Sequence, residues 1–253
     1  MKTIKILLLF LPLAIFAAAC SQSADAQKEQ QPPKKAADSI YIDSSAAKTP
    51  AKETETPKTT FINVDSLLKQ NDSVWVDMED IAPDMVFDIR YATTNNFVGE
   101  VMYDCPKCYL RVATARAALK VHNELKTKHN YKLKMYDCYR PLSVQRRLWK
   151  KVPDKKYVAP PDKGSQHNRG LAIDLTIVDE KGEELPMGTT FDFFGKEAHW
   201  SYTAHPANVN KNRQLLRSTM EKYGFGTSST EWWHYSYRQK SFTVSDYQWS
   251  CSK

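Results

Sequence analysis

The spacing of hydrophobic positions predicts two helices. From Val112 to His129, positions suited to burial recur every three or four residues, which is the period of a helix with one face toward a core. The positions on that face are Ala115, Leu119, His122 and Leu125. From Asn212 to Tyr223 the composition also favours a helix, and Gly224 is a suitable terminator for it.

Three other segments alternate in polarity or are rich in aromatic residues, and they predict strands. The first, Lys132–Tyr139, places four side chains on one side: Leu133, Met135, Asp137 and Tyr139. Leu171–Ile177 alternates in the same way, and Trp232–Arg238 is aromatic-rich. Pro141 ends the first strand, and a short helix over Ser143–Lys150, capped by its first residue, is expected next.

These strands and helices do not follow the regular rhythm of a doubly wound sheet, so the pattern favours an α+β fold. A chain of 253 residues is long enough for one full hydrophobic core. We therefore expect a single folded domain over residues 61–253. No second apolar stretch of the sequence is long enough to cross a bilayer.

The first twenty residues have the form of an export signal. A short positive region, Met1–Lys5, precedes an apolar run over Ile6–Phe16 and three alanines. Cys20 follows directly, in an arrangement that resembles a bacterial lipoprotein signal, whose thiol receives lipid. We expect cleavage of residues 1–19, lipidation of Cys20, and a membrane lipoprotein of the bacterial cell envelope that faces the periplasm. The alternative is an ordinary cleaved signal beside an incidental cysteine.

Residues 20–60 predict a disordered tether between this anchor and the domain. They are dominated by Lys, Glu, Gln, Ser, Thr, Ala and Pro, and such a segment buries too little apolar surface to offset its conformational entropy.

The charge of the remaining chain is mild. The net charge of the whole is +7, and beyond residue 60 there are 28 basic against 23 acidic side chains. This excess is too small and too dispersed to indicate a nucleic-acid partner. The sequence leaves the oligomeric state open.

Export would place four further cysteines in an oxidising compartment, where disulfides persist. Cys105, Cys108, Cys138 and Cys251 permit three pairings, and the sequence does not select one. The first two have the spacing of a redox motif or of half a zinc knuckle, but structural disulfides are the favoured interpretation.

The first group of chemically useful residues surrounds the strand at Leu171. Asp174 is a carboxylate inside an otherwise apolar strand, which is costly unless the carboxylate is paired or binds a cation. His167 lies just before that strand, and Gly170 permits an unusual backbone between the two.

The second group is Glu231-Trp232-Trp233-His234. In a regular strand Glu231 would face away from His234, so its participation requires a turn or bulge at the strand entrance. His167, Asp174 and His234 then form a three-ligand set of the catalytic zinc type, with Glu231 as the unligated base. Arg140, at the end of another strand, is placed to aim a permanent charge into a cleft.

The motifs around these residues resemble the D-alanyl-D-alanine dipeptidase family, the VanX-type zinc peptidases. The resemblance rests on Ser165-x-His167-x-x-Gly170-x-Ala172-x-Asp174 and on Glu231-x-Trp233-His234. It extends to three further segments: Arg90-Tyr91-Ala92-Thr93 with Asn96-Phe97, Tyr139-Arg140-Pro141, and Pro186-Met187-Gly188 with Phe191-Asp192-Phe193. Together these motifs span roughly Trp75 to Tyr237.

The resemblance implies a central, mostly antiparallel sheet flanked by helices, as in the zinc D-Ala-D-Ala peptidase and hedgehog-like fold. It implies one zinc ion per chain on His167, Asp174 and His234, with Glu231 as general base and then acid. It also implies that Arg140 stabilises the oxyanion, that Asp192 receives the ammonium of a small dipeptide substrate, and that Ser165 assists at the dipeptide. The extra cysteines and a short stretch between Pro141 and Ser165 depart from the family pattern.

Two alternatives stay open. A cell-wall carboxypeptidase of the same superfamily would use the same metal but needs an open cleft. A cell-wall binding protein would keep the fold without catalysis, although such a binder has no use for a base such as Glu231.

Overall fold

The computed structural model describes residues 69–155 and 157–251, all of which belong to one compact unit over residues 56–253. The predicted signal peptide, Cys20 and the tether of residues 20–60 lie outside the described residues, so they remain predictions. Within the described part, no helix is both long enough and apolar enough to span a membrane.

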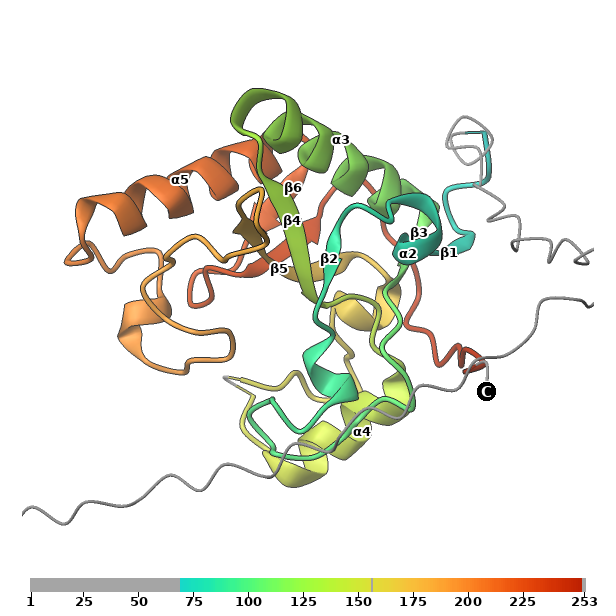
Figure 1. The fold of residues 1–253 in the computed structure, drawn as a ribbon. Coiled ribbons are helices and arrows are strands. Elements are labelled where there is room, and N and C mark those ends of the chain that lie inside the picture. Colours follow the sequence, from blue (N-terminus) through green and yellow to red (C-terminus); the bar gives the residue numbers. More distant parts are fainter. Residues whose placement is uncertain (1–68, 156, 252–253) are drawn as a thin grey trace, which may run out of the picture. The chain divides into compact units, whose positions relative to one another are not determined.

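The centre of the fold is a five-stranded sheet in the order β2-β4-β5-β7-β6 (Figure 1). Its strands are β2 (Val86–Phe87), β4 (Lys132–Asp137), β5 (Ala172–Val178), β6 (Phe225–Thr227) and β7 (His234–Tyr237). Only the pairing of β2 with β4 is parallel, and the other three pairings are antiparallel. The predicted α+β fold with a mostly antiparallel sheet is confirmed.

A separate two-stranded sheet lies beside it and pairs β1 (Trp75–Asp77) with β3 (Tyr109–Arg111). A single-turn helix, α2 (Met78–Ile81), follows β1 directly, and the Asp77 carboxylate caps it by accepting from the backbone N–H of Glu79. Strand β3 runs straight into the longest helix of the described chain.

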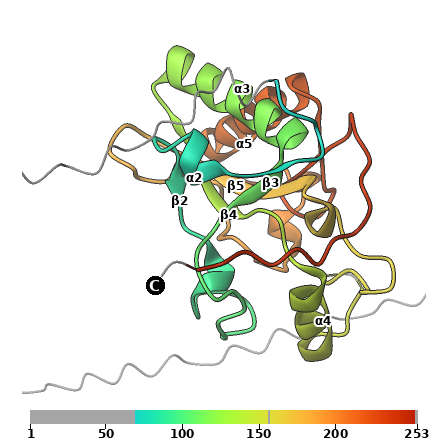
Figure 2. The same cartoon turned by 90° about the vertical axis from the view of Figure 1, so that its right-hand side faces the viewer.

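That helix is α3 (Val112–His129), with the bounds predicted from its periodicity. It ends because Asn130 adopts a left-handed backbone with φ of 56°, and its N–H returns to the carbonyls of the last turn. Helix α3 packs beside α5 (Ala207–Lys222), and the two lie on the same side of the large sheet (Figures 1 and 2). Helix α5 begins five residues before the predicted Asn212.

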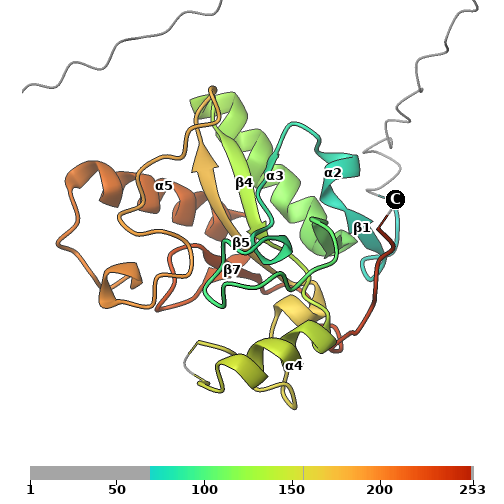
Figure 3. The same cartoon turned by 60° about the horizontal axis from the view of Figure 1, so that its bottom comes forward.

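Helix α4 (Leu142–Lys151) lies beyond the end of β4, away from α3 and α5 (Figure 3). Ser143 was expected to cap it, but the structure places Ser143 inside the first turn and Pro141 at the cap position. Proline fits there because its fixed φ suits a helix start and the first turn needs no N–H from it. The Ser143 prediction was therefore wrong by two residues.

Three single-turn 3₁₀ helices complete the described elements: η1 (Arg90–Ala92), η2 (His167–Arg169) and η3 (Lys196–Ala198). The core lies around the large sheet, and every residue of β5 is buried. The four cysteines of the described chain form two disulfides, Cys105–Cys251 and Cys108–Cys138, in agreement with the favoured interpretation.

Candidate active site

The strand register places three polar side chains in one row across the large sheet. Asp174 on β5 pairs with Asp137 on β4 and with His234 on β7. Directly opposed residues in neighbouring strands have their Cβ atoms about 5 Å apart, so their side chains meet on one face. The row joins residues that lie up to 97 positions apart in the sequence.

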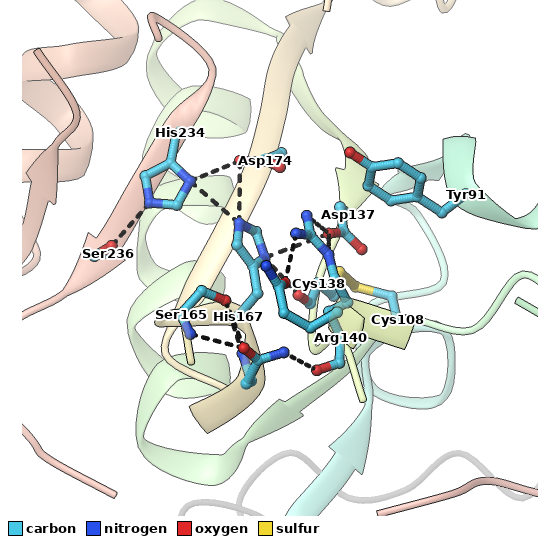
Figure 4. Close-up of polar contacts among 12 residues, drawn as sticks. Tyr91, Cys108, Asp137, Cys138, Arg140, Ser165, His167, Asp174, His234 and Ser236 are labelled. Atoms are coloured by element: carbon cyan, nitrogen blue, oxygen red, sulfur yellow. Dashed lines mark hydrogen bonds and ion pairs between the residues drawn. A yellow bond between two sulfur atoms is a disulfide. The ribbon is translucent and has the colours of Figure 1, made fainter. Parts of the chain in front are cut away.

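His167 reaches this row from η2, the turn that precedes β5 (Figure 4). The turn ends at Gly170, whose φ of 69° lies in the left-handed region. A Cβ atom there would come within 2.4 Å of the Trp75 ring, so only glycine fits without movement. The unusual backbone expected at Gly170 is present, and it aims His167 at Asp174.

Glu231 joins the same pocket because β7 starts later than predicted. Trp232 and Trp233 form a turn in which the N–H of His234 bonds to the carbonyl of Glu231 at 3.4 Å. A strand from Trp232 would have turned Glu231 away from His234. The turn that its participation required is thus observed.

The three predicted ligands converge. His234 Nδ1 lies 3.1 Å from His167 Nε2 and 3.0 Å from Asp174 Oδ1, and His167 Nε2 lies 3.4 Å from that oxygen. Ligands about 2.0–2.1 Å from a tetrahedral zinc ion are roughly 3.4 Å from one another. Two imidazole nitrogens and one carboxylate oxygen at this spacing fit zinc, with a fourth position left for water or substrate.

Neighbouring groups orient both histidines. His167 Nδ1 lies 2.7 Å from the carbonyl oxygen of Cys138, which can only accept, so Nδ1 carries the proton and Nε2 of the neutral ring is free to bind a metal. His234 has the opposite orientation, since its Nε2 contacts Ser236 Oγ at 3.0 Å and its Nδ1 faces the row.

Opposite charges and burial set the ionisation of this group. Burial disfavours the charged form of Asp174, but His167 and His234 outweigh it and hold its pKa well below the usual range. Burial likewise lowers the pKa of His234, and Asp174 more than offsets this, so the net shift is upward. Burial raises the pKa of Glu231, partly offset by His234, which brings this carboxyl closer to the range where a proton is easily exchanged.

Arg140 is buried and is held by three hydrogen bonds. Its Nε and Nη2 donate to Asp137 Oδ2 at 3.1 and 2.6 Å, and its Nη1 donates to Gln145 Oε1 at 3.1 Å. A guanidinium has five N–H donors, so two remain for a substrate oxygen. Burial lowers the pKa of Arg140, but Asp137 and the nearby tyrosines raise the pKa by more than burial lowers it, so the group stays charged.

Asp192 lines the same pocket as the ligands. Its φ of 57° is left-handed, a conformation that aspartate tolerates better than most residues, and Tyr91 Oη donates to its carboxylate at 3.2 Å. Burial raises the pKa of Asp192, and the carboxylates of Asp174 and Glu231 add to the effect. A cation that binds beside it would relieve this cost.

The remaining predicted residue, Ser165, also lines the pocket. Its N–H and Oγ lie 2.7 and 3.0 Å from Asn168 Oδ1, while Asn168 Nδ2 donates to the carbonyl of Arg140 at 2.7 Å. Ser165 is thus connected to Arg140 through Asn168. All seven predicted residues of the domain are brought to one pocket.

Part of the pocket wall was not predicted from the sequence, although Phe97 stood in one of the family motifs. Phe97, Tyr157 and Phe194 form an aromatic side, with ring centroids of Phe194 at 4.3 Å from Tyr157 and 5.1 Å from Phe97. Lys155 lines the pocket as well, and no acidic partner for it is present among the described residues. The stretch between Pro141 and Ser165, which looked short in the sequence, therefore supplies both a ring and a positive charge to the pocket.

Comparison with known proteins agrees with this geometry. The family model described as D-Ala-D-Ala dipeptidase, peptidase family M15, matches residues 71–252. The chain belongs to this dipeptidase family. It is 37% identical over 177 residues to the D-alanyl-D-alanine dipeptidase of Escherichia coli (strain K12), covering 70% of this chain and 91% of that protein.

Two further similarities were found. The D-alanyl-D-alanine dipeptidase of Enterococcus faecium is 32% identical over 189 residues, which cover 65% of this chain and 92% of that protein. A solved structure of the vancomycin-resistance D,D-pentapeptidase VanY, in complex with Zn(II), is 15% identical with a TM-score of 0.35, and the match covers 51% of this chain and 73% of that one.

Membership of the family confirms the resemblance seen in the motifs and the prediction of a peptidase. The predicted zinc cofactor is confirmed by the family together with the His-Asp-His set. The non-catalytic alternative loses its support, because Glu231 and Arg140 share a pocket with the metal ligands.

Proposed function

We propose that this dipeptidase hydrolyses free D-Ala-D-Ala at a zinc ion held by His167, Asp174 and His234. The observation that carries the proposal is that one pocket contains the three ligands, an unligated carboxylate at Glu231 and a second carboxylate at Asp192. Zinc bound there supplies a Lewis acid that makes water nucleophilic at about pH 7 and polarises the scissile carbonyl.

The residues of the chain supply the proton transfers and the charge stabilisation. Glu231 accepts a proton from the attacking water and then delivers it to the leaving amine, tasks for which a raised pKa is suited. The two free N–H groups of Arg140 compensate the charge that grows on the carbonyl oxygen. Donors of this kind are commonly worth about 3–4 kcal/mol in the transition state.

The same pocket accounts for both ends of a free dipeptide. Asp192, held by Tyr91, faces the substrate ammonium, and binding of a peptide with a blocked amine would leave this carboxylate without a charged partner, at a cost in free energy. Lys155 supplies a positive charge for the substrate carboxylate. Phe97, Tyr157 and Phe194 fill part of the wall of the same pocket, which favours a short substrate over a cell-wall chain.

The test compares D-Ala-D-Ala with its N-acetyl form, using the zinc-loaded full chain. We expect kcat/KM to favour the free dipeptide strongly, and Asp192→Asn to narrow this preference by about 30-fold or more, because removing one partner of a buried charge pair costs at least about 2 kcal/mol. Asp162→Asn, an exposed carboxylate outside the pocket, is the control and should change neither substrate.

A preference that survives in Asp192→Asn would remove Asp192 from substrate recognition. Wild-type enzyme that cleaves the acetylated substrate equally well would be a carboxypeptidase of the same superfamily, the second function that the sequence left open.

We further propose that the enzyme works in the bacterial cell envelope as a lipoprotein anchored through Cys20. The support is the signal-like leader and the cysteine that ends it. The two disulfides of the domain also suit an oxidising compartment.

A further inference from the structure

One short segment, Asp137–Arg140, both orients the metal ligand His167 and contains Arg140, the residue proposed to stabilise the transition state. The carbonyl of Cys138 accepts the Nδ1 proton of His167 at 2.7 Å. Asp137 binds the Arg140 guanidinium, and its Oδ2 lies 3.5 Å from the same His167 nitrogen. A shift of this segment would therefore disturb a zinc ligand and Arg140 at once.

The sheet alone does not fix this segment. The register between β4 and β5 becomes irregular between Met135 and Asp137, and β4 ends at Asp137. Beyond that point the backbone hydrogen bonds are few: Tyr139 N–H donates to the carbonyl of Tyr109 at 2.9 Å, and Arg140 N–H to that of His167 at 3.2 Å.

The disulfide Cys108–Cys138 adds a covalent connection at this point (Figure 4). Cys108 directly precedes β3 of the small sheet, and its carbonyl accepts from the N–H of Met78 on α2. Both cysteines are buried, with 0% and 1% exposed. The bond thus joins the segment that follows β4, which makes few backbone hydrogen bonds, to the small sheet and to helix α2.

We infer that the Cys108–Cys138 disulfide is a positioning element of the zinc site, so that full metal affinity requires this bond to be formed. The inference rests on the proposed ligand set. Without the bond, the peptide group that carries the Cys138 carbonyl is held by a single backbone hydrogen bond, from Tyr139 N–H to the carbonyl of Tyr109. The carbonyl can then move away from His167, which frees the imidazole to rotate. Loss of a group that orients a metal ligand typically lowers metal affinity about 10- to 100-fold.

The chain offers a matched control in its second disulfide. Cys105–Cys251 fixes the C-terminal segment, which packs Trp249 against Tyr103 and Tyr139, while Tyr139 Oη donates to the carbonyl of Tyr247 at 3.2 Å. These contacts are non-covalent, so this disulfide makes no direct bond to the Asp137–Arg140 segment. It closes a loop of 146 residues, whereas Cys108–Cys138 closes one of 30. Because a longer loop constrains the unfolded chain more, removal of Cys105–Cys251 should lower the stability more.

The experiment compares C108A/C138A with C105A/C251A in the full chain. Zinc dissociation constants are measured by competition with a chromogenic chelator, well below the melting temperature of either variant. We expect the zinc affinity of C108A/C138A to fall about 10- to 100-fold. At saturating zinc, we expect its kcat to fall by a larger factor than its KM changes, because Arg140 acts after substrate binding. C105A/C251A should stay within about threefold of wild type in zinc affinity although its Tm falls further.

Equal losses of zinc affinity in the two variants, or losses that follow Tm, would overturn the inference. If C108A/C138A does not fold, the wild-type protein replaces it in a reduction experiment. A dithiol reduces each protein disulfide to two thiols and is itself oxidised to a disulfide; the order of reduction is followed by thiol alkylation and mass spectrometry, and zinc release by a fluorescent chelator.

The partly exposed Cys105–Cys251 bond should be reduced first, and zinc should leave only with the second reduction. Zinc that leaves with the first reduction, or stays after the second, contradicts the inference. These measurements do not depend on which peptide is cleaved, so a failure of the proposed D-Ala-D-Ala activity would leave them unaffected and separately readable. A wild-type protein that binds no zinc would refute the ligand set itself.

Discussion

The chemistry at Glu231 depends on its being close to the metal ligands without being one of them. The turn at Trp232–Trp233 carries its carboxylate into the pocket, and the nitrogens of His234 are already directed to Asp174 and Ser236. A base that also acts as an acid needs a suitable pKa, and its carboxylate must be free to exchange a proton rather than bind the metal. The raised pKa of Glu231 meets the first need.

We therefore expect Glu231→Gln to retain zinc and to lose about 10²–10⁴ in kcat, the usual contribution of a general base, with a smaller change in KM. The amide keeps the size of the side chain and one accepting oxygen, but it takes up no proton. Zinc content is measured by atomic emission beside the kinetics, and Glu183→Gln on an exposed turn is the control. A variant with near-normal kcat would show that another group is the base.

At this scale the sequence predicted the groups that perform the chemistry but not the groups that orient them. His167, Asp174, Glu231 and His234 stand in motifs with recognisable spacing. The carbonyl of Cys138 and the hydroxyl of Ser236 do not, because any residue has a carbonyl and serine is common. Tyr91 was part of a quoted motif, yet its bond to Asp192 spans 101 residues and required the fold.

Among the elements, α3 shows how a predicted buried face acquires a second use. His122 was expected on that face. In the structure its Nδ1 accepts from the N–H of Leu133 on β4 at 3.3 Å, and its Nε2 lies 3.1 Å from Asp84 Oδ2. His122 therefore ties α3 to the sheet and to the segment before β2, away from the metal ligands.

This contact predicts a pH-dependent contribution to stability. Burial opposes ionisation of Asp84, but hydrogen bonds from Lys126 and His122 outweigh it and lower its pKa from 3.8 to about 2. Because the folded-state pKa is the lower one, the stabilisation is complete above about pH 4 and is lost as the pH falls through about 2. Asp84 is 40% exposed, so we expect Asp84→Asn to lower the free energy of unfolding by only about 1 kcal/mol at pH 6.

Urea unfolding at several pH values measures this difference, which should shrink toward pH 2. Asp104→Asn, an exposed carboxylate elsewhere, serves as the control. A difference that is constant with pH would mean that the charge of Asp84 contributes nothing.

Element boundaries departed from the pattern where tertiary contacts decided them. α3 matched its prediction because an unbroken helical period and Asn130 mark both its length and its end. β7 begins at His234 rather than Trp232 because Trp232 and Trp233 form a turn, which the alternation of polar and apolar residues does not reveal. The short β1, β2, β3 and β6 were not predicted, since two or three residues carry too little periodic signal.

For the whole molecule, the family, the α+β class and the mostly antiparallel sheet could be predicted, because five ordered motifs spread over the domain identified them. The pairing of the cysteines could not. Cys105 and Cys251 are 146 residues apart, and only the folded chain brings them together. Length, composition and spacing contain no information on such a contact.

The anchor is a property of the whole chain that remains a prediction. If Cys20 is lipidated, the wild-type protein should partition into the detergent phase of a cell extract, whereas Cys20→Ser should be found in the aqueous phase or keep its leader. Cys105→Ser is a control, since it removes a cysteine without touching the leader. Wild-type protein that is entirely in the soluble periplasmic fraction would show that the thiol carries no lipid.

The Cys108–Cys138 bond also bears on when, during its life, the enzyme becomes active. A chain newly made in a reducing cytosol has not yet formed this bond, so by the inference above its zinc centre is weak. A dipeptide such as D-Ala-D-Ala has to be made by an energy-consuming ligation, and an active hydrolase beside that ligase would undo its work. If the chain is exported as proposed, oxidation outside the cytosol would complete the zinc centre once, and the newly made enzyme would not hydrolyse the dipeptide inside the cell that makes it.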